Sequence, residues 1–285
     1  MNGLALQTMV NLDEKTDRLL QYAAQFESCA VAFSGGVDSA VVAKAACLAL
    51  GDRAIAVTGV SPSLADGELD EARRIAHLIG IRHETLATSE FENPDYVANR
   101  ADRCYHCKTE LYDHLGDLCD RLGVAVVFNG ANVDDQGDFR PGLRAADEHR
   151  VLSPLADCGI TKDEVRQLAA RWELPVWNKP ASPCLSSRVA YGEEVTPERL
   201  AMIDAAERFL RGAGLREVRV RYHKGDLARL EVAIDDLPKL TAPDFRAPLV
   251  TKFRELGFQY VSLDLEGFRS GSQNLVLPIE IVNRS

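Results

Sequence analysis

The sequence has no apolar run approaching the roughly 18 residues that a membrane-spanning helix needs. Its first ten residues also lack the basic start and apolar stretch of a signal peptide. Basic residues (33) are outnumbered by acidic ones (43), so that the formal net charge is −10. This balance argues against a surface that holds nucleic acid mainly by neutralising phosphates. We therefore expect a cytoplasmic protein that contacts no membrane, and we do not expect a nucleic-acid partner.

The cysteines do not form the pattern of a secreted, disulfide-linked protein, because they number seven and are scattered along 285 residues. There is one CxxC pair, Cys104 and Cys107, and no second one. A further cysteine, Cys184, lies in a polar loop. These thiols are therefore available for metal binding or catalysis. The length and the 46% content of hydrophobic residues allow one or two domains with a packed core.

The most informative segment is residues 29–39, where an apolar run leads directly into the sequence SGGVDS. A continuous apolar run is typical of a buried parallel strand, and a helical pattern follows it up to residue 50. Glycines let a backbone approach an anion, the first N–H groups of a helix bind it, and serine hydroxyls add donors. A carboxylate beside phosphates calls for Mg²⁺. The predicted ligands of a pyrophosphate group and its metal are Ser34, Gly35, Gly36, Asp38 and Ser39.

An ordinary glycine-rich turn would explain this segment without a ligand, but it would not need both serines and the aspartate. The lysine of a Walker A loop is absent. The segment resembles instead the PP-loop of the ATP pyrophosphatases, which cleave ATP between the α and β phosphates.

Apolar strand patterns alternate with helical patterns in the first two thirds of the chain, which is typical of right-handed βαβ units around a parallel sheet. The expected strands are residues 30–33, 54–60, 83–86 and 124–128. The expected helices are residues 37–50, 64–79, 105–122 and one that a capping box opens at Thr161. Beyond about Gly192 the pattern changes to helices at 198–211 and 245–256 and strands at 218–222, 227–234 and 258–265.

We therefore predict an α/β fold with two domains. Residues 1–192 would form a PP-loop domain with a parallel sheet, similar to adenine nucleotide α-hydrolases. Residues 193–285 would form a smaller α+β domain for substrate binding and oligomerisation. Four residues fall at the ends of predicted strands, where an open α/β sheet binds ligands, and are candidates for an adenine pocket: Thr58, Gly59, Asn129 and Gly130. Plain turns at strand ends explain them equally well. For Asp134 and Asp135 we favour solvated loop carboxylates over a role near the metal, and we leave Asp138 open between the two.

The thiols of Cys104, Cys107 and Cys184 are candidate ligands of one [4Fe–4S] cluster. Three thiolates would satisfy three irons and leave the fourth open to a substrate or sulfide. A single CxxC is a weak signal, since zinc and redox sites also use it, although zinc would need a fourth ligand that His106 is badly placed to supply. The plain alternative is that these cysteines are small buried apolar residues.

Arg219 and Arg221 are two residues apart in a predicted strand, so that their side chains project from one face. Two guanidinium groups on one face suit a phosphate, because each can donate paired hydrogen bonds. An exposed strand that happens to carry two arginines is the alternative from spacing alone.

Segments along nearly the whole chain together resemble the LarE family of sulfur transferases, which acts in nickel-pincer nucleotide synthesis. They are residues 34–39, 104–108, 138–143, 177–179, 186–188 with 191–192, 218–221 and 263–271. The resemblance implies an enzyme that uses ATP and Mg²⁺ to adenylate a carboxylate of pyridinium-3,5-biscarboxylic acid mononucleotide and releases pyrophosphate. Sulfur then replaces AMP, and repetition on the second carboxylate gives the thiocarboxylate precursor of the lactate racemase cofactor. A homo-oligomer, such as a hexamer, is also implied, whereas the sulfide donor stays unidentified.

For the site residues, the resemblance implies catalytic roles for Cys184, Asp38, Ser187 and Arg188. It also implies a substrate-phosphate site in which Glu207 and Arg188 accompany Arg219 and Arg221. Arg269 is a possible addition to this site, with no assigned role.

The family has two sulfur sources. In one branch a loop cysteine gives up its own sulfur and becomes dehydroalanine; in the other, a CxxC and a loop cysteine resemble a [4Fe–4S] site that carries an extra sulfide. Cys104 and Cys107 stand where the sacrificial branch has no cysteines, and Cys184 lies one residue nearer the SSR segment than the sacrificial cysteine does. Both departures favour the cluster branch. A sacrificial role for Cys184 in the absence of the cluster stays open.

Other classes of protein share parts of this pattern. A PP-loop enzyme that thiolates tRNA would use the same loop and three cluster cysteines, but would usually add zinc knuckles or an RNA-binding domain. An amide-forming ligase related to NAD synthetase would leave Cys184 and the two strand arginines unused. A nucleotide-binding module without catalysis would not need the three thiols.

Overall fold

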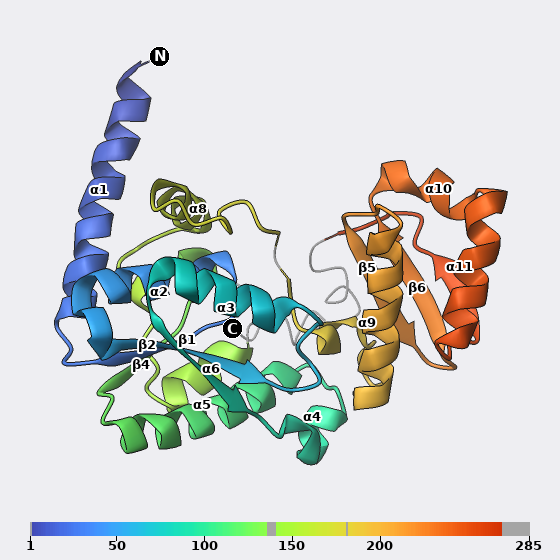
Figure 1. Cartoon of the computed structure of the whole chain (residues 1–285), viewed down its shortest axis with the longest axis horizontal. Helices are drawn as coiled ribbons and strands as arrows, with labels where there is room; N and C mark the ends of the chain where they lie inside the picture. The colour runs from blue at the N-terminus through green and yellow to red at the C-terminus, as the bar shows by residue number, and fades with distance from the viewer. Residues whose placement is uncertain (1, 136–140, 181, 270–285) are drawn as a thin grey trace.

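The computed structural model describes residues 2–135, 141–180 and 182–269 (Figure 1). The larger part of it is built on a parallel sheet with the strand order β3-β2-β1-β4. These strands are β1 (Cys29–Ala32), β2 (Ala54–Val60), β3 (Arg82–Ala87) and β4 (Val126–Phe128). The predicted α/β fold with a parallel sheet is confirmed.

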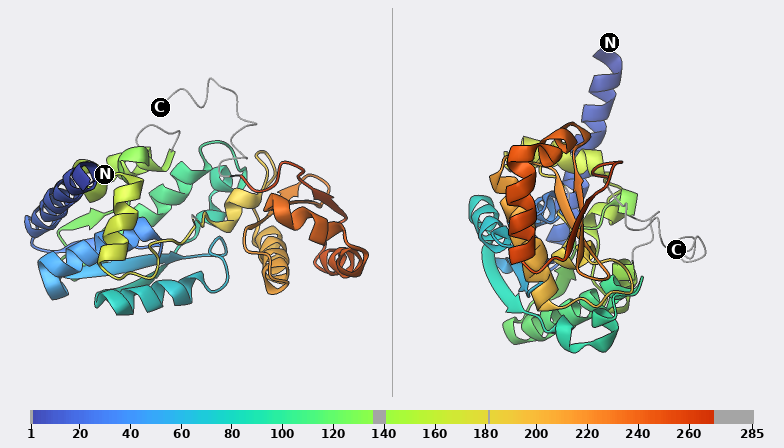
Figure 2. Two further views of the ribbon diagram at one scale, coloured as in Figure 1. Left: turned by 90° about the horizontal axis from the view of Figure 1, so that it is seen from above. Right: turned by 90° about the vertical axis from the view of Figure 1, so that its right-hand side faces the viewer.

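Helices cover both faces of this sheet, as the two views of Figure 2 show. One face packs on α2 (Val37–Leu50) and α3 (Glu68–Ile79), and the same apolar cluster includes α1 (Asn2–Ala24), α7 (Pro154–Asp157) and α8 (Lys162–Arg171), of which α1 and α8 pack on α2. The other face packs on α5 (Arg103–Leu122) and α6 (Pro141–Glu148). The short helix α4 (Pro94–Val97) precedes α5.

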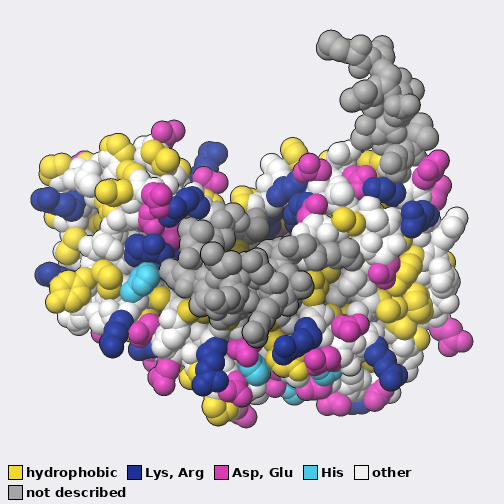
Figure 3. All heavy atoms as spheres, turned by 180° about the vertical axis from the view of Figure 1, so that it is seen from behind, with side chains coloured by type: hydrophobic (Ala, Val, Ile, Leu, Met, Phe, Trp, Pro, Cys, Tyr) yellow, Lys and Arg dark blue, Asp and Glu magenta, His cyan; other side chains and the backbone are white. Residues whose placement is uncertain are grey.

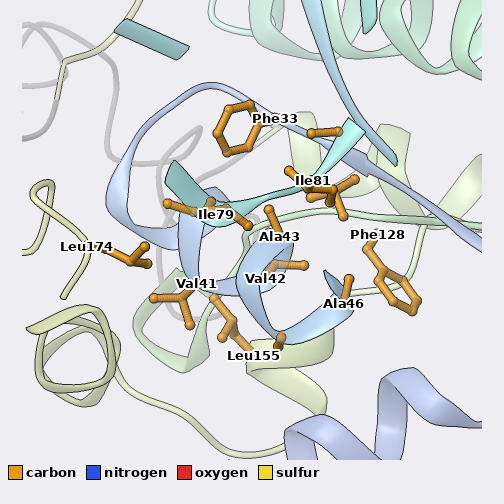
Figure 4. Close-up of a cluster of buried hydrophobic side chains, with 14 of the residues drawn as sticks. Phe33, Val41, Val42, Ala43, Ala46, Ile79, Ile81, Phe128, Leu155 and Leu174 are labelled. Atoms are coloured by element: carbon orange, nitrogen blue, oxygen red, sulfur yellow. The ribbon is translucent and has the colours of Figure 1, made fainter. Parts of the chain in front are cut away.

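Successive side chains of β1 point to opposite faces of the sheet, and this explains the two apolar clusters that cover it. Cys29 and Val31 belong to the apolar cluster under α2, whereas Ala30 belongs to the cluster under α5. Helix α2 is apolar on most of its surface, with nine buried residues, and Figure 4 shows Val41, Val42 and Ala46 within that cluster. The site-bearing loop between β1 and α2 is thus fixed by buried elements at both ends.

The second part contains a three-stranded sheet with the order β5-β6-β7. β5 (Val218–His223) and β6 (Leu227–Val232) are antiparallel, and β7 (Tyr260–Leu263) runs parallel to β6. The helices of this part are α9 (Pro197–Gly212), α10 (Leu237–Thr241) and α11 (Pro243–Glu255). This confirms the predicted smaller α+β part. Its apolar core also takes in Tyr96, Leu185 and Val189, and the predicted boundary at residue 192 stays a prediction.

Some expected elements differ from the structure. The helix expected from residue 64 begins at Glu68, because residues 61–67 form turns that end in Gly67 with a φ of 81°. Helices α1 and α6 were not predicted. Among the described residues no helix is both long and apolar enough to cross a membrane.

Candidate functional site

The SGGVDS loop folds around its own serines. The Ser34 amide donates to Oγ of Ser39 (3.2 Å), the two hydroxyls are 3.1 Å apart, and the Gly36 amide donates to Oγ of Ser34 (3.3 Å). Gly35 has a φ of 69°, and a Cβ there would meet Cα of Ala72 at 3.0 Å, so glycine is required by conformation and by space. The loop therefore presents the first N–H groups of α2, which have no partner within the helix, to a ligand.

Asp38, the second residue of α2, is held by two side chains from other segments. Its Oδ2 accepts from Nζ of Lys162 at 2.5 Å, and its Oδ1 accepts from Nδ2 of Asn132 at 3.1 Å. A cation thus already faces the carboxylate that was expected to hold Mg²⁺, and this carboxylate would be one ligand of an ion that takes its others from phosphates and water. Neither partner was identified from the sequence, although the capping box of Thr161 and Glu164 marks the helix start beside Lys162.

Gly130 lies directly against this site. A Cβ at Gly130 would come within 2.9 Å of the Ser39 nitrogen and 3.1 Å of the Asp38 Cβ. The segment after β4 can therefore reach α2 only because residue 130 is glycine. Asn129, which precedes it, is buried and accepts from the Ala131 amide (2.9 Å).

Thr58 does not present its hydroxyl to a pocket. It is buried, and its Oγ1 donates to the Phe33 carbonyl at 2.7 Å, just before the loop. Since that proton is used, Oγ1 must accept from Nε2 of His83 (2.8 Å), which fixes the proton of this ring on Nε2. Burial, with the charge of Arg73, lowers the pKa of His83. At Gly59, a Cβ would meet Cδ1 of Leu111 at 2.9 Å.

The prediction that Asp134 and Asp135 are merely solvated is wrong for Asp135. Its carboxylate is buried, and Oδ2 accepts from the Asn132 amide at 3.0 Å. Asp134 is exposed but accepts from the Lys162 amide at 2.6 Å, so both carboxylates shape the loop around Asp38. Asp138 lies outside the described residues.

The three candidate cluster cysteines come from two segments that approach each other. Cys104 and Cys107 lie in the first turns of α5, and Cys184 directly precedes the 3₁₀ helix Leu185–Arg188. Cys104 and Cys184 are exposed, and Cys107 is half-buried. The Arg103 guanidinium joins the segments, because its Nη1 donates to the Ser186 carbonyl (2.7 Å) while Nη2 lies 4.0 Å from Sγ of Cys104.

Burial and neighbouring charges shift the pKa values of groups around these thiols. Burial raises the pKa of Cys107 to about 12, and the charges of Cys184, Glu90 and Cys104 add to this effect. The positive charge of Lys108 lowers the same pKa without cancelling the rise. Burial would lower the pKa of Lys108, but Tyr112 and all three cysteines outweigh it and raise this pKa.

This donor set fits a [4Fe–4S] cluster in its chemistry, because thiolates ligate such clusters and two cations, Arg103 and Lys108, lie beside them. Within the described part of the chain, no three His, Cys, Asp or Glu side chains are close enough to hold a metal ion. The residue types thus suit a cluster, whereas the side chains do not stand as a formed metal site among the described residues.

Arg188 holds the loop that carries Cys184. Its guanidinium is 1% exposed and donates through Nη1 to the carbonyls of Pro183 (2.5 Å) and Cys184 (3.1 Å) and to Oγ of Ser187 (3.0 Å). Its Nε pairs with Oε1 of Glu207 at 3.0 Å, and Glu207 is also 1% exposed. These two residues, expected at the site, lie beneath it and position it.

Other contacts fix the same loop from both parts of the molecule. The Leu185 amide donates to the Ser63 carbonyl (2.9 Å), and the Tyr96 hydroxyl is 2.7 Å from that of Ser186. From the second part, Nη1 of Arg221 donates to the Ser187 carbonyl (2.7 Å). The loop of Cys184 is therefore the junction between the PP-loop part and the second sheet.

The two strand arginines differ in their surroundings. Arg221 is buried and makes a double contact with Glu231, Nε to Oε1 at 3.1 Å and Nη2 to Oε2 at 3.0 Å. Burial, followed by the charge of Arg188, lowers the pKa of Arg219 to about 10. The Arg219 guanidinium also stacks on the ring of Phe268, 4.9 Å from its centre.

The negative charge of Glu207 raises the pKa of Arg219, but it does not outweigh burial and Arg188. The positive charges of Arg221 and Arg211 lower this pKa further. Several guanidinium groups around one position produce a positive potential that favours an anion. Arg269 pairs with Asp264 and Glu266, and its place in the phosphate site stays a prediction.

Over the described residues on the face shown in Figure 3, Lys and Arg side chains are interspersed with Asp and Glu. This mixed surface differs from the continuous basic face that binds RNA.

No family model matches the sequence. The chain is 47% identical over 266 residues to an uncharacterized protein of Synechocystis sp., covering 93% of this chain and 99% of that protein. It is 37% identical over 271 residues to the pyridinium-3,5-bisthiocarboxylic acid mononucleotide synthase of Lactiplantibacillus plantarum, covering 93% of this chain and 96% of the synthase. A tRNA-specific 2-thiouridylase of Syntrophus aciditrophicus is more distant, with 28% identity over 192 residues and about half of each chain covered.

Proposed function

Because the chain belongs to the LarE family of pyridinium-3,5-bisthiocarboxylic acid mononucleotide synthases, we propose that it makes this thiocarboxylate nucleotide by ATP-dependent sulfur transfer. The substrate would be pyridinium-3,5-biscarboxylic acid mononucleotide. The observation that carries the proposal is the placement of Cys184, whose loop is bonded to Ser63 in the PP-loop part and to Arg221 in the second part. Sulfur, ATP and a phosphate site would then meet at one junction.

The first step is adenylation. A carboxylate oxygen of the substrate attacks the α-phosphorus of ATP, and the bond to the β-phosphate breaks so that pyrophosphate leaves. The N–H groups of the SGGVDS loop and the hydroxyls of Ser34 and Ser39 would bind the charge that develops on pyrophosphate. Asp38 would hold the accompanying Mg²⁺.

The arginine face would bind the phosphate of the mononucleotide. Arg219 is the best placed of the four guanidinium groups, because burial and then the charge of Arg188 lower its pKa, and a bound anion would offset the repulsion from Arg188, Arg221 and Arg211. Arg221 and Arg188, each paired with a buried glutamate, would hold the face in position.

In the second step a sulfur atom attacks the acyl carbon and AMP leaves. Cys104, Cys107 and Cys184 would hold a [4Fe–4S] cluster, which when bound supplies an iron-held sulfide. The chain's own contribution is the positive charge of Arg103 and Lys108, which offsets the three thiolates. We also propose that the enzyme is cytoplasmic and works as a homo-oligomer.

Phosphorus NMR of the reaction with substrate, Mg²⁺ and sulfide tests the adenylation directly. AMP and pyrophosphate are the expected products. ADP and orthophosphate would contradict the assignment, because they would show transfer of the γ-phosphoryl group. An electrophoretic shift of bulk tRNA by the protein would instead support tRNA thiolation.

A further inference from the structure

We propose that Lys162 is an exchangeable counter-ion for Asp38. Its ammonium group holds the carboxylate in the nucleotide-free enzyme and moves onto the phosphates when ATP brings Mg²⁺ to Asp38. The inference rests on the ATP-dependent function proposed above and adds to it a residue of the nucleotide site.

Both carboxylate oxygens of Asp38 already accept a hydrogen bond without a metal. Oδ2 accepts from Lys162 Nζ at 2.5 Å, and Oδ1 accepts from Asn132 at 3.1 Å. The aspartate stands in the first turn of α2, two positions after Gly36 of the loop. A divalent cation that binds Oδ2 therefore meets the ammonium group already bound there and is repelled by it.

The backbone of Lys162 is fixed, so only its side chain needs to move. Thr161 caps α8 in a capping box with Glu164, and the Lys162 amide donates to Oδ2 of Asp134 at 2.6 Å. The rest of the side chain is a flexible stem that ends in a rotatable point charge. It can turn from Asp38 toward a phosphate without any change in the fold.

The ion pair is also easily exchanged. The side chains of Lys162 and Asp38 remain 33% and 25% exposed, and pairs reached by solvent contribute little to stability. Phosphate oxygens give an ammonium group stronger, charge-assisted hydrogen bonds. Once Mg²⁺ occupies Asp38, the two cations repel each other, which further favours the phosphate position for Lys162.

This exchange makes the binding of metal and of phosphate cooperative. Lys162 competes with a divalent cation in the free enzyme, and pyrophosphate removes that competitor. By linkage, each ligand then raises the affinity for the other by the same factor.

The test uses Mn²⁺ as the probe in electron paramagnetic resonance titrations, with and without pyrophosphate. The unmodified protein should bind Mn²⁺ weakly alone and tightly with pyrophosphate. In Lys162→Ala we expect free-enzyme Mn²⁺ affinity to rise about tenfold and the coupling to pyrophosphate to fall by about the same factor. Lys15→Ala is the matched control, since it removes the Lys15–Glu164 ion pair (2.7 Å) at the same helix terminus without touching Asp38.

The control should bind Mn²⁺ and pyrophosphate as the unmodified protein does, and similar melting temperatures for both variants would show that they are folded. Unchanged Mn²⁺ affinity in Lys162→Ala, in a protein that still binds ATP, would overturn the exchange alone. Failure of the unmodified protein to bind ATP or pyrophosphate with Mn²⁺ would overturn the proposed function, and the exchange with it.

Discussion

Arg188 and Glu207 form an ion pair at 3.0 Å in which each side chain is only 1% exposed. The pair connects the loop of Cys184 to helix α9, and Glu207 also accepts from the Val220 amide (3.1 Å) and from Arg211 (2.6 Å). Each of these two buried charges, the Arg188 guanidinium and the Glu207 carboxylate, is therefore compensated by the other. This pair therefore helps to hold the loop that carries Cys184 in place.

Replacement of Arg188 by Ala should destabilise the protein by about 3–5 kcal/mol, because it leaves the Glu207 carboxylate buried with less compensation. Arg211 limits the loss. Urea denaturation measures it. The double replacement Arg188→Met with Glu207→Leu should restore part of the stability, and a double variant as unstable as Arg188→Ala would show that packing, rather than the stranded charge, is responsible.

Low pH should weaken the ion pair between Arg188 and Glu207. Burial raises the pKa of Glu207, but the charge and hydrogen bond of Arg188, with Arg211 and the Val220 amide, outweigh burial and bring this pKa below its usual 4.5. The folded state therefore binds the proton more weakly than the unfolded state. The contribution of the Glu207 carboxylate to stability is full above pH 4.5 and is lost as the pH falls through the pKa of this group in the folded state.

Urea denaturation of the unmodified protein and of Glu207→Gln at several pH values checks this. The difference between their free energies of unfolding should be greatest near neutral pH and should shrink below about pH 4.5. A difference that does not change with pH would contradict the linkage.

The two strand arginines should respond differently to replacement by Ala. Arg219→Ala should lower affinity for the pyridinium mononucleotide by about 1.5–3 kcal/mol and leave ATP binding unchanged. Arg221→Ala should instead destabilise the fold by about 3–5 kcal/mol, because Glu231 is 0% exposed and loses its paired contact. Calorimetric titration with each ligand, together with thermal unfolding, separates the effects; equal loss of ATP and substrate affinity in Arg219→Ala would rule out a dedicated phosphate site.

Each of Cys104, Cys107 and Cys184 should be needed for iron binding. Replacing any one by Ala removes a thiolate ligand, so anaerobic reconstitution should give little iron and no brown colour. Cys47→Ala is the control, because its thiol lies near the Ile79 and Gly80 carbonyls on the opposite face of the sheet from α5. Full iron content in all three single variants would contradict the cluster assignment.

The strand, loop and helix around SGGVDS could be predicted from the sequence because their signals are local. Residues that surround Asp38 could not, since Lys162 is separated from it by 124 positions and is brought there only by the packing of α8 on α2. Strand alternation likewise predicted that Arg219 and Arg221 share a face. The alternation could not show that Arg221 forms an ion pair with Glu231, a buried residue on the neighbouring strand.

Contacts of buried polar groups account for two further side chains. Thr58 stays a candidate for the adenine pocket, and its buried hydroxyl donates to the Phe33 carbonyl. Asp135 looked like a solvated carboxylate, but the Asn132 amide binds it. The Thr58 contact joins segments that are 25 positions apart, whereas the Asp135 contact spans only three positions and forms in a buried turn.

Mass spectrometry of the reaction with ATP, Mg²⁺, pyridinium-3,5-biscarboxylic acid mononucleotide and sulfide, using anaerobically reconstituted protein, tests the proposed sulfur transfer most directly. We expect a product in which carboxyl oxygen is replaced by sulfur, in amounts exceeding the protein, with Cys184 unchanged. Formation of AMP without any sulfur in the nucleotide would contradict sulfur transfer. Product that stops at the amount of protein, with Cys184 converted to dehydroalanine, would contradict the cluster and establish the sacrificial route.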